Sequence, residues 1–489
     1  MKKPWNKVLI VLVVALLVIL ADAWNTGKIK IYYQDSEEKA QGGETKHTKE
    51  ENVSVPPGIS SGKEVRVLLS TSNYVGVYHD KVTVCGTKGM TVRIDGKEET
   101  YAPKEKVAFL STKEKKQVTI SPVSGGRLQL LSVTRQNRHP AYRGMLELNW
   151  TKQGYTLINE IPLEQYLYAV VPSELSTGSK MEALKAQAVC ARTYAYNQIA
   201  AGRFRKYNAD LDDSVSCQVY NNLPEDKRSR MAVNATKNQV VTKNSKRVQA
   251  YYYSTSWGKS ASGKEVWETE KEISYLQSSM QQEGSETNGD MDLSKETSFR
   301  KFMTQTDIAT YDKGSEWYRW SVVIPEKSLA NRIDATLQEC YRSNRSKVLT
   351  QQKNGTYRKQ PLKSIGKLKN IRVEKRGKSG IVTQLVVVGS NTVVKVSSQY
   401  NVRKILAPGS IPVSLKKRKT SVSMLPSAAF YIDRVKSKEG ISYEIYGGGF
   451  GHGTGMSQYG AVEMAKQGKN YEEILQFYFA GCEVAEAQK

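Results

Sequence analysis

The apolar pattern between residues 179 and 202 predicts one long helix. Its apolar side chains recur at three- and four-residue steps, the period of one helix face. These positions are Met181, Leu184, Ala188, Ala191, Ala195 and Ile199. Ser179 and Glu182 have the S-x-x-E spacing of a capping box, and Gly202 is a candidate C-terminal stop.

Arg192 interrupts this helix pattern with a charge. It lies four residues after Ala188 and three before Ala195, so we expect it at the margin of the apolar stripe. A guanidinium in that position needs an acceptor, because an unpaired buried charge is expensive. Glu174, which we expect in a loop just before the helix, is the candidate partner. The pair is either an acid tuned for proton transfer or a structural ion pair, and these residues alone favour the structural interpretation.

Short alternating apolar runs dominate the chain on both sides of this helix. Those between Glu64 and Ile158 predict a β-rich N-terminal module, and a second β-rich stretch runs from Trp317 to Val413 around a single helical segment near Leu329–Cys340. Two helices close the chain after a glycine loop that begins at Gly447.

These elements predict an α+β fold, with β-rich modules around a core that holds the long helix and the two C-terminal helices. The expected parts are a signal peptide or membrane anchor (1–24), a polar linker (25–60), a β-rich N-terminal module (61–158), a core (159–278 and 414–489) and an inserted, partly β-rich region (279–413).

The N-terminus has the pattern of an export signal. Basic residues precede an apolar run from Val8 to Ala21, and Ala21-Asp22-Ala23 fits a signal-peptidase site. A cleaved signal peptide and an uncleaved membrane anchor both fit this pattern. In either case we expect an extracytoplasmic protein.

Charge adds a preference for acidic partners. The 489-residue chain carries 73 Lys and Arg against 48 Asp and Glu, a net charge of +25. Nucleic acid is the usual partner of so basic a chain, but export argues against it, and no nucleic-acid-binding motif is present. Anionic cell-wall polymers are the natural acidic partners outside the membrane. A scaffold that binds any polyanion is a weaker alternative.

Cysteine and histidine usage argues against a metal site. The five cysteines are widely scattered without a C-x-x-C pair, and the chain has only four histidines. A closed zinc site needs four soft ligands with local spacing. Cys217 is the residue that deserves a check, but we expect neither a metal nor a cofactor.

Six motifs in order resemble the SpoIID/LytB family of sporulation and cell-wall proteins. They are SGKEVRVLLSTSNYVGVYH near residue 61, YRGMLELNW at 142, VVPSEL…MEALKAQAVCARTYAY from 170, LDDSVSCQVY at 211, YYYSTSWGKSASGKEVW at 251, and GGGFGHGTGMSQYGAVEMAKQGKNYEEILQFYF from 447. The matches span residues 61 to 479. Because many relatives are tethered to the membrane, the resemblance favours an anchor formed by residues 8–21.

The resemblance implies lytic transglycosylation of peptidoglycan strands that have lost their stem peptides. Glu174 matches the acid of the family motif, and Arg192 accompanies it in the catalytic assignment. The matching substrate-binding positions are Tyr252, Trp257, Lys259, His452, Ser457 and Gln458. Relatives usually have glycine where Trp257 stands, so this indole either adds a stacking platform for a sugar or narrows the local turn.

Several alternatives remain open at the level of the sequence. The glycine loop lacks the ending of a phosphate-binding loop, so it either lines a glycan groove or forms a hairpin packed tightly against a strand. Asp212 and Asp213 are the acids to consider if the enzyme hydrolyses glycan instead. Some relatives enhance a separate wall amidase without cutting glycan, which makes a non-catalytic binding module the main rival.

Overall fold

The computed structural model describes residues 63–487 except 75, 114–115, 223, 285–290 and 306–307. The expected signal or anchor and the polar linker therefore lie outside the described residues. Within these ranges, no helix has both the length and the apolar character that a membrane span requires.

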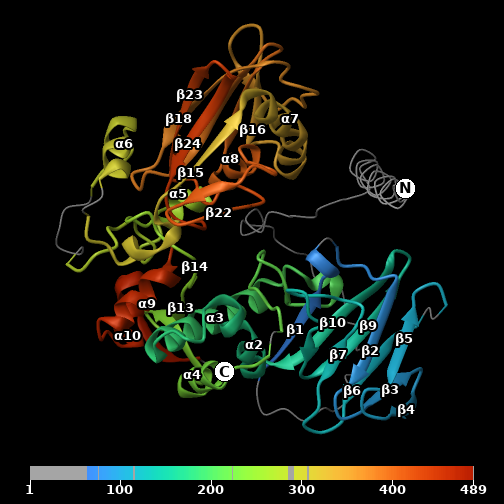
Figure 1. Ribbon diagram of the computed structural model, residues 1–489. Helices are drawn as coiled ribbons and strands as arrows, with labels where there is room; N and C mark the ends of the chain where they lie inside the picture. The colour runs from blue at the N-terminus through green and yellow to red at the C-terminus, as the bar shows by residue number, and fades with distance from the viewer. Residues whose placement is uncertain are drawn as a thin grey trace, which may run out of the picture. The chain divides into compact units, whose positions relative to one another are not determined.

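The chain folds into two compact units. Among the described residues, the first unit contains 63–174 and Gln198–Asp226, and the second contains Leu175–Asn197 and 227–487. The predicted α+β class is confirmed, because sheets and helices both contribute to the fold (Figure 1).

The first unit is built mainly from β-strands, as the alternating runs predict. Its strands are β1 (Glu64–Leu69), β2 (Lys81–Gly86), β3 (Met90–Ile94), β4 (Lys97–Tyr101), β5 (Lys106–Leu110), β6 (Val118–Pro122), β7 (Leu128–Leu130), β8 (Ala141–Tyr142), β9 (Met145–Thr151), β10 (Gly154–Pro162) and β11 (Leu211–Asp212). Seven strands form one sheet in the order β11-β1-β10-β9-β6-β3-β4, and four form another in the order β5-β2-β7-β8. Helix α2 (Leu163–Glu174) continues directly from β10.

The long helix is confirmed as α3 (Met181–Ala201). Gly202 has a positive φ of 61°, so it ends the helix as expected. The expectation of one apolar face was too narrow, since an unbroken run from Ala186 to Ala195 is buried. Many of these residues are alanine, and small side chains allow close packing on every side of a helix.

The second unit contains the remaining elements. They are α4 (Lys227–Ala235), β12 (Gln239–Lys243), β13 (Lys246–Arg247), β14 (Tyr252–Tyr253), α5 (Gly263–Trp267), α6 (Glu296–Thr304), β15 (Trp320–Pro325), α7 (Glu326–Ser343), β16 (Val348–Gln351), β17 (Tyr357–Arg358), β18 (Leu368–Arg376), β19 (Val382–Gly389), β20 (Val393–Ser397), α8 (Gln399–Ile405), β21 (Val413–Leu415), β22 (Lys419–Thr420), β23 (Phe430–Ser437), β24 (Gly440–Gly447), β25 (Met456–Ser457), α9 (Gln458–Lys466), α10 (Tyr471–Tyr478) and β26 (Glu483–Glu486).

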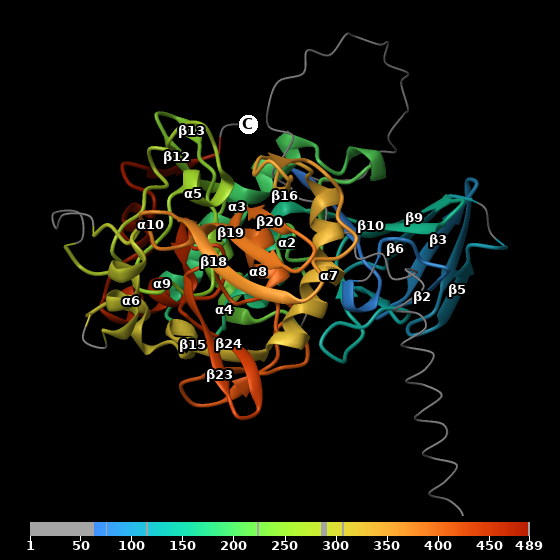
Figure 2. The same ribbon diagram turned by 90° about the horizontal axis from the view of Figure 1, so that it is seen from above.

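Two five-stranded sheets organise the middle of the second unit. Their orders are β22-β21-β15-β24-β23 and β17-β16-β20-β19-β18. Strand β15 lies between β21 and β24, so the first of these sheets joins strands from both sides of residue 413. The long strands β23 and β24 run side by side in both ribbon views (Figures 1 and 2).

The helical content of this region exceeds the sequence expectation. The single expected helix near Leu329–Cys340 is present as α7, but α8 follows β20 as a second helix. Ser398 begins α8 by accepting a hydrogen bond from Asn401 N at 3.3 Å. A seven-residue helix is too short to show a helical period in the sequence.

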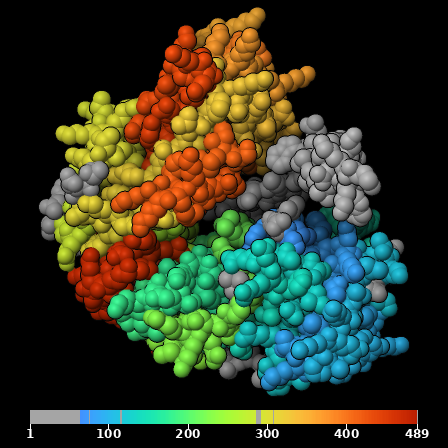
Figure 3. All heavy atoms as spheres, in the orientation of Figure 1, coloured from blue at the N-terminus to red at the C-terminus, as the bar shows by residue number. Residues whose placement is uncertain are grey.

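The two closing helices are confirmed as α9 and α10. They pack with α3 around a core that includes Ala186, Cys190, Ala461 and Ile474. In the space-filling view, the red C-terminal segment also forms part of the molecular surface (Figure 3). The glycine loop between β24 and α9 is therefore held at both ends by regular structure.

Candidate functional site

Glu174 is the last residue of α2, not a loop residue as expected. The helix forms in spite of Pro172 because its buried residues, including Tyr166, Leu167, Val170 and Val171, follow the helical period. The Glu174 Oε1 atom accepts a hydrogen bond from the Val219 N–H at 2.7 Å. The side chain is half-buried in the first unit, so the carboxyl group is oriented and partly shielded.

The segment around Val219 adds residues that the sequence did not reveal. Asn221 N donates to Ser173 Oγ at 3.3 Å, and the Tyr74 hydroxyl donates to Asn221 Oδ1. Burial, together with the charge of Asp213, raises the pKa of Tyr74 to about 12, and Glu174 contributes to this rise. Tyr74 has a positive φ of 58°, a strained conformation that is often found near functional sites.

Asp212 and Asp213 are both occupied by internal partners. Asp213 forms an ion pair with Arg135 at 2.6 Å, with side chains 0% and 1% exposed, and also accepts from Ser70 N at 3.0 Å. Asp212 accepts from the Ser214 N–H at 3.1 Å and from the Ser216 hydroxyl. Burial raises the pKa of Asp212. These contacts make both acids part of the internal framework of the first unit.

Arg192 lies fully buried in the second unit. Its guanidinium donates to Gln239 O at 3.1 Å, Val233 O at 3.2 Å and, more weakly, Thr236 Oγ1 at 3.5 Å. Val233 belongs to the last turn of α4, where carbonyl groups lack helical partners and favour a positive charge. Arg192 therefore joins α3 to the end of α4 and the start of β12. Its pairing with Glu174 stays a prediction.

The glycine loop packs tightly against the segment that contains β14. Phe450 and Thr255 exchange backbone hydrogen bonds of 2.8 and 3.1 Å, and β14 pairs in parallel with β25. A Cβ atom on Gly455 would lie 2.0 Å from Tyr251 O, and one on Gly453 would lie 2.5 Å from the Trp257 ring. The glycines therefore allow a hairpin to pack tightly against a strand. This was one of the two interpretations of the glycine loop that the sequence left open.

Ser457 and Gln458 begin α9 and are both buried. Ser457 Oγ accepts from Gly460 N and donates to Asp312 Oδ1 at 2.5 Å, so this hydroxyl caps the helix. Gln458 donates to Gln187 on α3 at 3.3 Å. The burial of both side chains does not support their assignment to substrate binding. That assignment stays a prediction.

Asp312 is a buried acid that the sequence did not single out. Its Oδ1 also accepts from Ser256 N at 2.9 Å, while Oδ2 has no hydrogen-bond partner among the described residues. Burial raises the pKa of Asp312 to about 6. The carboxyl group ties the β14 segment and the start of α9 to the segment Tyr311–Gly314.

The side chains of Trp257 and Lys259 are also buried in the interior of the second unit. Trp257 is 1% exposed and its indole donates to Ser379 O at 2.9 Å, so no ring face is open to a sugar. Lys259 is 0% exposed and donates to Met291 O. Of the two roles considered for Trp257, its position below the glycine loop fits the shaping of the local turn.

His452 and Tyr252 are the partly exposed members of the expected substrate-binding set. The His452 ring lies 5.4 Å from Trp267, 5.6 Å from Tyr253 and 6.2 Å from Tyr251, measured between ring centroids. Burial and the charge of Arg403 lower the pKa of His452 to about 4. The imidazole is therefore neutral near pH 7 and belongs to an aromatic cluster.

Cys217 was the residue to check for a metal ligand. It receives a contact from Arg203 at 3.4 Å, and burial raises the pKa of its thiol. In the described part of the chain, no three His, Cys, Asp or Glu side chains gather into a metal-binding group.

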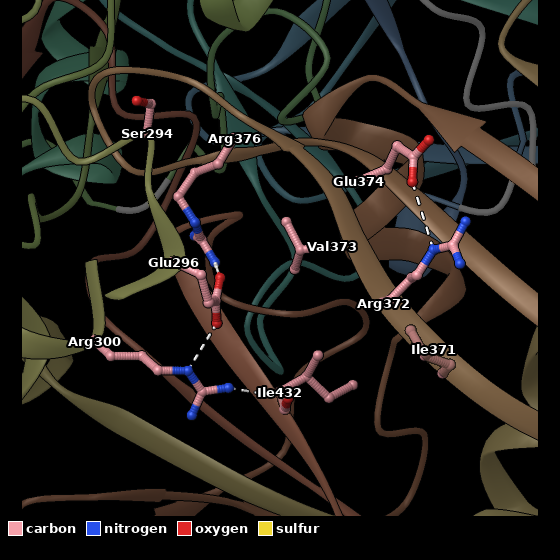
Figure 4. Close-up of a pocket in the computed structure, with 9 residues that line it drawn as sticks. All are labelled: Ser294, Glu296, Arg300, Ile371, Arg372, Val373, Glu374, Arg376 and Ile432. Carbon is pink, nitrogen blue, oxygen red and sulfur yellow. Dashed lines mark hydrogen bonds and ion pairs between the residues drawn. The ribbon is translucent and has the colours of Figure 1, made fainter. Parts of the chain in front are cut away.

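A cavity of about 410 Å³ lies between α6, β18 and β23 (Figure 4). It is lined by Ser294, Glu296, Arg300, Ile371, Arg372, Val373, Glu374, Arg376 and Ile432. Each arginine of the lining has a carboxylate partner: Arg300 pairs with Asp433, Arg376 with Glu296, and Arg372 with Glu374. The lining charges are thus compensated, and the candidate catalytic and substrate-binding residues lie elsewhere.

Comparisons with known proteins agree with the motif pattern. Residues 151–242 match the family model described as Stage II sporulation protein (SpoIID), and residues 261–455 match a domain of unknown function, DUF8618. The first match contains Glu174 and Arg192, and the second contains Asp312 and most of the glycine loop.

Curated relatives cover about two thirds of the chain. An "Amidase enhancer" of Bacillus subtilis is 29% identical over 319 residues, which are 64% of this chain and 39% of the relative. "Stage II sporulation protein D" of the same organism is 24% identical over 345 residues, 68% of this chain and 76% of the relative. The protein of that name in Bacillus amyloliquefaciens is 27% identical over 346 residues, with the same coverage. The chain thus spans well under half of the amidase enhancer but about three quarters of the sporulation proteins. These matches confirm the resemblance to the SpoIID/LytB family that the motifs indicate.

Proposed function

We propose that this protein is a peptidoglycan lytic transglycosylase with Glu174 as its acid. The substrate is a glycan strand without stem peptides, cut between N-acetylmuramic acid and N-acetylglucosamine. Glu174 donates its proton to the glycosidic oxygen as the bond from C1 to that oxygen breaks. The 6-hydroxyl of the sugar that contains this C1 atom then bonds to C1 and gives its proton to the carboxylate. This step closes a 1,6-anhydro ring.

The observation that carries this proposal is the anchored position of Glu174. Its carboxyl group stands at the acid position of the family motif, and the hydrogen bond from Val219 N fixes its orientation. An ordinary glycosidase uses two carboxyl groups, whereas this reaction needs one. The internal contacts of Asp212 and Asp213 support a single-acid mechanism, because these neighbouring acids already have partners.

A role connected with the cell wall follows from the family and from the names of its relatives. The net charge of +25 favours binding to the anionic polymers of the wall. We further propose an extracytoplasmic location, with residues 8–21 as a membrane anchor or cleaved signal peptide.

A second candidate function is enhancement of a wall amidase without glycan cleavage. The relative named "Amidase enhancer" favours it, as does the structural role of the buried Arg192 contacts. In that case the protein binds glycan or the amidase, and Glu174 serves only to join α2 to the segment around Val219.

The two candidates differ in their response to Glu174→Gln. The full-length chain and this variant are incubated with denuded glycan strands, and release of soluble fragments is followed with time. We expect Glu174→Gln to lower the rate by about a thousandfold. Glu164→Gln, on the first turn of the same helix, is the matched control and should keep the wild-type rate. Strand binding without cleavage by the wild type would favour the enhancer function.

A further inference from the structure

We propose that Tyr251, Trp267 and His452 form a subsite that binds one pyranose ring of an amino-sugar glycan. These three residues are called the aromatic subsite below. The inference rests on the proposed action on glycan, and it assigns sugar contact to Trp267 instead of Trp257.

The aromatic subsite is assembled from three separate segments of the second unit. Tyr251 precedes β14, Trp267 ends α5, and His452 lies in the glycine loop. Ring centroids are 5.0 Å apart for Tyr251 and Trp267 and 5.4 Å apart for Trp267 and His452. All three side chains are partly exposed. Tyr194 and Tyr253 lie behind them, 9% and 4% exposed, and support the rings from within.

The Trp267 indole differs in its hydrogen bonding from other tryptophans in the described part of the chain. Trp150, Trp257 and Trp320 each donate their indole N–H to a backbone carbonyl, at 2.8, 2.9 and 3.0 Å. The buried Nε1 of Trp267 has no hydrogen-bond partner in the described structure. A buried donor without a partner costs about 1–3 kcal/mol, so a rotation of the partly exposed indole that brings this N–H to an acceptor on a ligand is favoured.

The imidazole of His452 contributes a neutral ring face. Its Nδ1 accepts from Thr454 N at 3.2 Å, and the ring also has a hydrogen bond with the backbone of Tyr252. These contacts hold the ring in place, and the low pKa of the imidazole keeps it uncharged. What remains for a ligand is the flat surface of the ring.

This combination fits a sugar better than it fits a cation. The C–H face of a pyranose packs on aromatic rings, and its hydroxyl and acetamido oxygens can accept from an indole N–H. A cation also binds aromatic faces, but it carries no acceptor for the Trp267 N–H. The net charge of +25 also opposes a cationic ligand.

The test measures binding of chitotetraose, a tetramer of N-acetylglucosamine, to the full-length chain by calorimetry. Trp267→Ala should weaken binding by about tenfold, because it removes the stacking surface. Trp267→Phe keeps an aromatic face but loses the N–H, and should weaken binding by about fivefold. Tyr446→Ala is the matched control, since Tyr446 is a partly exposed ring stacked on Tyr431 in another sheet. It should leave the affinity unchanged.

Equal affinities of wild type, Trp267→Ala and Trp267→Phe would overturn the inference, as would a wild type that does not bind chitotetraose. Thermal melting of each variant separates loss of the subsite from loss of the fold, and Trp267→Phe keeps the test decisive if Trp267→Ala unfolds. Failure of the proposed function has a different signature: the wild type would bind chitotetraose through Trp267 but release no fragments from glycan strands.

Discussion

The Val219 N–H and the Glu174 Oε1 atom are joined by a hydrogen bond of 2.7 Å. This bond connects the last residue of α2 to the segment after β11, so the orientation of the proposed acid depends on a backbone group 45 residues further along the chain. A backbone donor is as rigid as the chain that carries it, which suits a carboxyl group that must meet a glycosidic oxygen in one geometry.

Removal of this donor tests the relationship without changing the acid. Proline has no N–H, so Val219→Pro should lower the rate of glycan cleavage by at least about tenfold. Val219→Ala keeps the N–H and should cleave at nearly the wild-type rate. Cleavage rates and melting temperatures of both variants are compared, and wild-type cleavage by Val219→Pro would show that the hydrogen bond does not matter for the reaction.

The buried ion pair between Asp213 and Arg135 should contribute strongly to stability of the first unit. Asp213→Ala leaves an uncompensated guanidinium in the interior and should lower the free energy of unfolding by about 3–5 kcal/mol. The control is Glu98→Ala, which breaks an exposed pair with Arg93 and should cost less than about 1 kcal/mol. Denaturant unfolding measures both. Similar costs for the two variants would argue against a framework role for Asp213.

Asp312 should make the stability of the second unit depend on pH. Burial raises its pKa to about 6 in the folded protein, above the value of 3.8 for an unperturbed aspartate. Between about pH 4 and pH 6 the folded state holds a proton that the unfolded state has lost, so this group makes stability fall as pH rises. The full loss, on the order of 3 kcal/mol, is reached above about pH 6.

Asp312→Asn removes this titration while keeping an oxygen for Ser457 and Ser256. Compared with wild type, the variant should gain about 2–3 kcal/mol of relative stability between about pH 4 and pH 7.5. The difference between the two proteins isolates the contribution of Asp312, because every other group is common to both. Parallel stability curves for wild type and variant would contradict the assignment.

Gly455 should be intolerant of a side chain. It has a φ of +80°, and a Cβ atom would lie 2.0 Å from Tyr251 O. Gly455→Ala should therefore cost at least about 3 kcal/mol, through backbone strain and displacement of the β14 segment. Gly468 has a φ of +93° with no atom within 4 Å of an added Cβ, so Gly468→Ala should cost only about 1–2 kcal/mol. Equal melting temperatures for the two variants would remove close packing as the reason for the glycine.

The local spacing of apolar residues was sufficient to predict those helices and strands whose sequences show a clear helical or alternating period. The strands of the first unit, α3, α7 and the two closing helices all follow from apolar spacing or caps. Helix α2 was missed because Pro172 argues against a helix, yet six buried residues hold it in place. Tertiary packing thus overrode the local preference.

The candidate site depends on contacts that local pattern does not encode. Asp312 meets Ser457 across 145 residues, and its neighbours in the sequence do not mark it as buried. Trp257 and Trp267 both follow the tyrosine-rich segment, but only the fold places the first beneath the glycine loop and the second beside His452. The sequence shows that these aromatic residues are present. Which of them is exposed depends on how the whole chain folds around them.

Mass spectrometry of the ends produced from denuded glycan strands is the sharpest test of Glu174 as the single acid. The full-length wild type and Glu174→Gln are compared under the same conditions. We expect 1,6-anhydro ends from the wild type and none from Glu174→Gln, because one carboxyl group both donates and removes the proton. Reducing ends from the wild type, or anhydro ends from Glu174→Gln, would rule out this single-acid mechanism.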